Sequence, residues 1–87
     1  MKPGEDFVVQ GVADLANGRE TIPALLVSIG APRLRRLGVS IPDLLFPSPE
    51  HRLYAKLRDE DPMTAHSRYN ALIRRLVSFA RASECAI

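Results

Sequence analysis

The chain has 87 residues, 46% of them hydrophobic and 25% charged, a balance that is typical of one small globular domain and excludes wholesale disorder. Twelve basic and ten acidic residues leave a net charge of +2, a smaller excess than a dedicated nucleic-acid-binding domain usually carries. The single cysteine, Cys85, excludes an internal disulfide and a cysteine-based zinc site. The N-terminal residues lack a signal-peptide pattern and the longest apolar stretch, residues 22–31, is too short to span a bilayer. We therefore expect a soluble cytoplasmic protein without membrane, metal or cofactor.

A first helix is predicted over residues 5–17. Val8, Val12 and Leu15 recur at spacings of four and three residues, so their side chains fall on one side of a helix. Asn17 precedes a glycine that can adopt the left-handed conformation without a steric cost, and such glycine residues commonly end helices. We therefore expect this helix to face the core with one side and to end at Asn17.

A second helix is predicted to begin at Thr21, a capping residue, with Pro23 in its first turn. Its apolar residues occur on all sides, which is typical of a central, buried helix. Gly30 and Pro32 interrupt the pattern, because proline lacks a backbone N–H and disfavours helical geometry at the residue before it. We expect the helix to be broken or kinked near these residues, and we favour a break, with residues 32–37 as a short second piece.

Residues 39–47 are predicted to form an extended connection that contains two prolines and places three large apolar residues against the core. A third helix follows this connection. Ser48 is its predicted cap and Pro49 occupies its first position, where the missing N–H matters least. We expect this third helix to end near Arg58 or Asp59.

The last helix is predicted to be the longest, with Asp61 as its cap, a proline in its first position and an end near Ser83. Its apolar residues fall within about 120° of the helix circumference, a stripe that would face the core. The fold is therefore predicted as all-α, a single compact domain of four helices over residues 1–87, with residues 1–4 and 84–87 frayed. The stripe consists of Ala65, Tyr69, Leu72, Ile73, Leu76, Phe79 and Ala80.

Arginine residues are the main candidates for binding an anionic partner. Arg33, Arg35 and Arg36 either contact phosphates or acidic groups, or border an amphipathic turn with their heads in water, the interpretation we favour. In the last helix two pairs of arginines bracket the apolar stripe on separate flanks instead of forming one ridge. This arrangement indicates a solvated border with local salt bridges to Glu84 or to the acidic residues before the helix. The pairs are Arg74 with Arg81, and Arg68 with Arg75.

Catalytic chemistry has weak support in the sequence. His66, Asn70 and Arg74 stand four residues apart and share one edge of the last helix, but no nucleophile accompanies them. A hydrolase-like enzyme using His66 would require His51 to converge with it in a cleft. The five glycines are scattered singly, without the spacing of a phosphate-binding loop. Two histidines without nearby partner ligands are also a poor basis for a metal site.

We expect the chain to act as a small helical protein-interaction module. Its apolar content is generous for its length, so the residues that a monomer cannot enclose would bind a protein partner or a second copy in a homodimer. Leu44, Leu45 and Phe46 are the predicted exposed anchor, rimmed by the arginines of residues 33–36. Phe46→Asp would then abolish binding and leave helicity intact. The alternative is nucleic-acid binding through the cationic set Arg33, Arg35, Arg36, Arg74 and Arg75.

Overall fold

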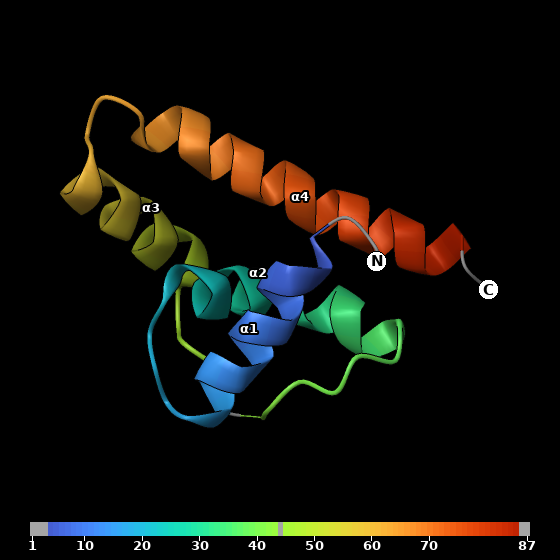
Figure 1. Cartoon of the computed structure of the whole chain (residues 1–87). Coiled ribbons are helices and arrows are strands. Elements are labelled where there is room, and N and C mark those ends of the chain that lie inside the picture. Colours follow the sequence, from blue (N-terminus) through green and yellow to red (C-terminus); the bar gives the residue numbers. More distant parts are fainter. Residues whose placement is uncertain (1–3, 44, 86–87) are drawn as a thin grey trace.

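The computed structural model describes residues 4–43 and 45–85, and most of them lie in four helices. No strand occurs within these two ranges, so the predicted all-α, four-helix fold is confirmed. The radius of gyration is 12.5 Å, close to the roughly 12 Å expected of a compact domain of this length. Figure 1 shows α3 leading into the long α4, which extends across the other helices. The helices are α1 (Glu5–Ala16), α2 (Ile22–Arg36), α3 (Pro49–Glu60) and α4 (Ala65–Cys85).

Helix α2 is the central element, because it packs against α1, α3 and α4. Ala24, Leu25 and Val27 are buried although they point in different directions around the helix, so the prediction of a central, buried helix is confirmed. The helix begins as the sequence indicates. The side-chain oxygen of Thr21 accepts a hydrogen bond from the backbone N–H of Ala24, at 3.2 Å.

The favoured break in the second helix is wrong. Helix α2 is continuous from Ile22 to Arg36 and contains Pro32. Ala31 and Leu34, on either side of the proline, are fully buried, so breaking the helix would expose both. Their burial stabilises the helical path against the local cost of the proline, whose exposed ring lies on the solvent side.

Helix α1 packs closely on α2 at Gly11. A Cβ atom at this position would lie 2.4 Å from both the carbonyl oxygen of Pro23 and a methyl carbon of Val27, so only glycine allows this helix separation. Helix α1 ends at Ala16, and Gly18 follows with φ 70°, which confirms the predicted glycine stop. This contact places the middle of α1 against the first two turns of α2.

The segment between α2 and α3 contains no helix among its described residues, as predicted for residues 39–47. Gly38 has φ 91° and turns the chain out of α2. Ile41 is buried in the core, and the Arg35 guanidinium donates a hydrogen bond to the carbonyl oxygen of Pro42 at 2.9 Å. These contacts fasten the connection against the end of α2.

The predicted start of α3 is confirmed, because Ser48 is its N-cap residue and Pro49 its first residue. Ser48 nevertheless adopts φ 47° and makes no side-chain cap bond, and α3 continues to Glu60. The predicted cap of α4 is wrong, and Asp61 has another role. Its carboxylate accepts a hydrogen bond from the backbone N–H of Met63 at 3.1 Å, which closes a local turn, and α4 begins only at Ala65.

The hydrophobic core has two clusters, and Phe46 and Leu76 pack against both. One cluster joins α1 to the length of α2 from Ala24 to Leu34, and the other joins the first half of α2 to α3. Helix α4 covers both clusters with the predicted apolar stripe, but it does so unevenly. The stripe is buried at Ala65, Phe79 and Ala80 and only half-buried at Tyr69, Leu72, Ile73 and Leu76.

Candidate functional site

The half-buried middle of α4 borders a groove against the first turns of α1 and α2. This α1–α2–α4 groove has a volume of about 410 Å³ and opens to solvent. Its floor is apolar, and the only charged side chains among the described residues that line it are two arginines. The lining consists of Phe7 of α1, Ile22 and Pro23 of α2, and Arg68, Ala71, Leu72 and Arg75 of α4.

The two arginines of the groove stand on one flank of α4. Arg68 and Arg75 are seven residues apart, so they project in nearly the same direction and are separated by about 10 Å along the helix. Ala71 lies between them and is exposed, and Leu72 is half-buried toward the core. The result is a strip with a cationic group at each end and an apolar surface between.

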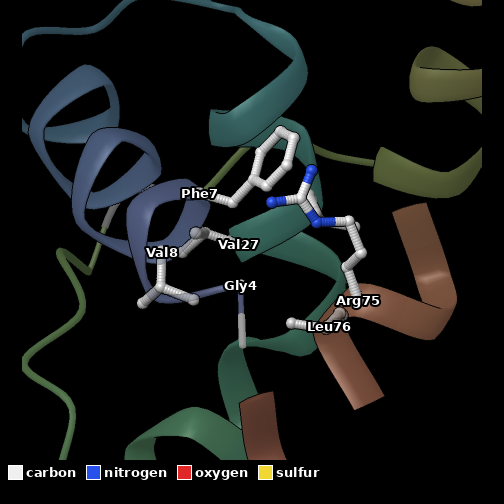
Figure 2. Close-up of a pocket in the computed structure, with 7 residues that line it drawn as sticks. Gly4, Phe7, Val8, Val27, Arg75 and Leu76 are labelled. Atoms are coloured by element: carbon white, nitrogen blue, oxygen red, sulfur yellow. The ribbon is translucent and has the colours of Figure 1, made fainter. Parts of the chain in front are cut away.

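Arg75 is held over the groove by α1. Its guanidinium carbon lies 4.0 Å from the centre of the Phe7 ring, a cation–π contact, and its Nη2 donates to Oδ1 of Asp6 at 3.4 Å. Figure 2 shows the Arg75 side chain reaching from α4 toward the Phe7 ring on α1. These two contacts orient the guanidinium although almost half of the side chain is exposed.

Beneath this contact lies a small apolar recess that is too narrow to hold water. Figure 2 shows Gly4 at its base, close to Leu76. Gly4 has φ 77°, and a Cβ atom there would lie 2.9 Å from the carbonyl oxygen of Arg75. Glycine therefore allows the start of α1 to approach the backbone of α4, which places Phe7 beside Arg75.

Arg68 forms the other end of the strip. Its Nη2 lies 3.0 Å from Oε1 of Glu60, and both side chains remain 39% and 49% exposed. The prediction of a local salt bridge to the acidic residues before α4 is confirmed for this arginine. Because Glu60 and Asp6 pair with the arginines without lining the groove, the groove itself presents only positive charge.

The predicted anchor does not protrude from the surface. Leu45 and Phe46 are half-buried and pack against the core, and Leu44 lies outside the described residues. The large apolar side chains that are exposed in the described part of the chain are instead Val9 on α1 and Met63 in the α3–α4 turn. Leu45 and Phe46 therefore contact the core, as expected of the extended connection, and do not form an exposed anchor.

The predicted rim arginines lie in the last turn of α2 and have different partners. Arg33 donates two hydrogen bonds to Oε1 of Glu84, at 2.9 and 3.2 Å, and Arg35 binds a backbone carbonyl, whereas Arg36 is exposed. Arg33 borders the flank of α4 that carries Val77, opposite the flank of Arg75. Arg74 is exposed and projects about 100° from Arg75. The five arginines of the nucleic-acid alternative therefore do not form one surface.

The two histidines are not brought together. His66 lies in the first turn of α4, where its Nε2 is 3.2 Å from Nδ2 of Asn70, and His51 lies in the first turn of α3. Because α4 begins next to the end of α3, His51 lies away from His66 by most of the length of α3, roughly 14 Å along the helix axis. Both are exposed, so no cleft holds them. Within residues 4–43 and 45–85, no three potential metal ligands gather.

Sequence reasoning missed most of the groove. It placed Arg68 and Arg75 on one flank of the last helix but interpreted them as a solvated border. Phe7 had no signal that linked it to that flank, since it is distant in the sequence. The available hint was the run from Gly4 to Phe7, in which a flexible residue precedes a large apolar one at the start of a helix.

Comparison with protein-family models, with curated proteins and with solved structures finds no match to this chain. In the part of the chain that the structure describes, no helix combines the length and apolar character needed to cross a bilayer. The fold and the groove define a small all-α domain whose strongest candidate site is an apolar groove rimmed by two arginines.

Proposed function

We propose that the chain is a protein-interaction module whose α1–α2–α4 groove binds an apolar segment of a partner protein. The observation that carries the proposal is the groove itself. Its volume of about 410 Å³ falls within the approximately 300–1,000 Å³ that is typical of binding pockets. Phe7, Ile22 and Leu72 are half-buried there, so a bound segment would remove apolar surface from water.

A protein segment fits the groove better than a small polar ligand does. The side chains that line it, among the residues the structure describes, include no hydroxyl, amide or imidazole group that would orient such a ligand. The groove is open and follows α4 for about two turns, from Arg68 to Arg75, so an elongated ligand gains more contact than a compact one. An amphipathic helix that lies along a hydrophobic groove is a common form of peptide recognition. The two arginines favour a partner with acidic groups beside its apolar face.

Ala71→Trp tests the site, because Ala71 is exposed on α4 and lines the groove. A tryptophan there fills the groove without entering the core. The matched control is Ala55→Trp, since Ala55 is exposed on α3 and does not line this groove. Peptides are selected for binding from a random library on the wild-type chain, and their affinities are then measured for all three proteins.

We expect the selected peptides to bind the wild-type chain and Ala55→Trp alike and to lose at least about ten-fold in affinity for Ala71→Trp, equivalent to about 1.4 kcal/mol. Circular dichroism checks that both variants keep the wild-type helicity. Failure to select any peptide, or equal binding to Ala71→Trp, contradicts the proposal. Sedimentation of the three proteins tests whether a second copy of the chain occupies the groove. A wild-type dimer that dissociates in Ala71→Trp would assign the groove to that second copy.

A further inference from the structure

Each arginine at the rim of the α1–α2–α4 groove already holds a carboxylate of the protein itself. Arg68 pairs with Glu60 at 3.0 Å, and Arg75 pairs with Asp6 at 3.4 Å. The acidic partners come from α3 and α1, and they pair with the arginines at the two ends of the strip. The same arrangement therefore occurs twice. A guanidinium group lines the groove, and a carboxylate that does not line the groove forms an ion pair with it.

We infer that the segment bound by this groove is acidic. Two of its carboxylates form ion pairs with Arg68 and Arg75 and so replace Glu60 and Asp6. The inference rests on the proposed function and names the chemistry of the partner. Both ion pairs are largely in water, with the Asp6 side chain 63% exposed. Such pairs contribute little to folding, so exchanging one carboxylate for another costs the protein little.

The distance between the two arginines sets the distance between the two carboxylates of the ligand. A separation of about 10 Å along α4 matches two carboxylates that are two helical turns apart in the partner, with the apolar side chains of the intervening turn on the floor between them. Arg75 is partly preorganised, because the Phe7 ring keeps its guanidinium over the groove. A guanidinium also binds a carboxylate through two parallel hydrogen bonds, which favours an acid over a neutral amide.

Synthetic peptides test the charge requirement directly. One helical peptide of about 18 residues carries leucines at two central positions and glutamates two turns apart on either side of them. A second peptide replaces both glutamates with glutamines, and a third replaces them with lysines. We expect the glutamate peptide to bind the full chain about ten-fold more tightly than the glutamine peptide and the lysine peptide to bind weakest. The preference for glutamate should shrink at high salt.

A pair of protein variants tests the exchange itself. Asp6→Asn and Glu5→Gln each remove one negative charge from the first turn of α1, but only Asp6 pairs with Arg75. We expect Asp6→Asn to bind the glutamate peptide about two- to five-fold more tightly than the wild type, because the competing carboxylate is gone. Glu5→Gln should change this affinity much less, and neither variant should alter binding of the glutamine peptide.

The outcomes separate this inference from the proposed function. If the glutamate and glutamine peptides bind equally, or if Glu5→Gln acts as strongly as Asp6→Asn, the acidic partner is wrong while the groove still binds protein. If an oligonucleotide displaces the glutamate peptide at lower concentration, the arginines bind phosphate and both ideas fail. If no peptide binds and Ala71→Trp has no effect on any selected ligand, the proposed function fails and the inference fails with it.

Discussion

Asp14 lies on α1 with only 3% of its surface exposed, yet it is a carboxylate. The hydroxyl of Thr21 donates a hydrogen bond to its Oδ2 at 2.6 Å, and the amide of Gln10 donates one to its Oδ1 at 3.0 Å. The Thr21 hydrogen bond is the largest influence on the carboxyl group and lowers the pKa of Asp14 below its ordinary value of 3.8, although burial acts in the opposite direction. One carboxylate therefore joins the end of α1 to the cap of α2.

The lowered pKa of Asp14 predicts that acid weakens the fold. The unfolded chain binds a proton more readily at this residue, so the contribution to stability is complete above the unfolded pKa and is lost as the pH falls through the folded pKa. We expect the wild-type chain to lose more stability than Asp14→Asn between neutral pH and about pH 3, as measured by urea unfolding. Thr21→Val should also reduce the pH dependence, because it removes the main donor. Identical pH dependence in all three proteins contradicts this role.

Helix α2 shows how burial can stabilise a helix against its local sequence. Pro32 cannot donate to the carbonyl of Ser28, and its ring crowds that carbonyl. The hydroxyl of Ser28 meanwhile donates to the carbonyl oxygen of Ala24 at 2.9 Å, so the previous turn has an additional bond. The burial of Ala31 holds the chain helical through the proline.

Pro32→Ala is expected to stabilise the protein by about 1–3 kcal/mol, since it restores a backbone donor and removes the ring clash, while the more flexible unfolded chain offsets part of the gain. Pro32 is exposed, so the substitution leaves the core unchanged. Pro49→Ala is the control, because Pro49 is the first residue of α3, where proline suits the helix. Urea unfolding measures both variants, and an equal effect of the two would contradict this explanation.

The same contrast explains which elements the sequence predicts. The spacing of apolar residues and the glycine stops predict the bounds of α1 and the start of α2 to within about one residue. These signals depend only on residues within one helical turn. The path through Pro32 was missed because its cause is tertiary packing. The start of α4 was missed because the Asp61 side chain accepts a hydrogen bond from Met63 and closes a turn. An aspartate side chain can form such a turn or cap a helix, and local propensity does not distinguish the two.

At the scale of the molecule, the groove depends on segments that are distant in sequence. Arg68 and Arg75 could be placed on one flank of α4 from helical periodicity alone. Phe7 completes the site only because α1 packs on α2 through Gly11 and reaches α4 through Gly4. Neither approach is visible in the sequence, since each depends on the absence of a side chain opposite a particular backbone atom.

Phe46 provides a further test at this scale, because it packs against both core clusters, one centred on α1 and α2 and the other on α2 and α3. If Phe46 were only a surface anchor, its loss would affect association and leave the fold intact. Its position between the clusters instead predicts a structural role. Truncating a half-buried aromatic side chain at such a junction removes apolar contacts from both clusters and leaves a cavity between them.

We therefore expect Phe46→Ala to lower the free energy of unfolding by about 2–3 kcal/mol, and Phe46→Asp to lower it further because the charge replaces apolar contacts. Urea unfolding followed by circular dichroism reports on all four helices, and tyrosine fluorescence reports on the second cluster, where the rings of Tyr54 and Tyr69 lie 5.8 Å apart. Both signals should shift to lower urea together. Val9→Asp is the control, since Val9 is 65% exposed and its substitution should change stability little. If Phe46→Asp keeps wild-type stability but prevents association, Phe46 is a binding anchor and the two clusters do not depend on it.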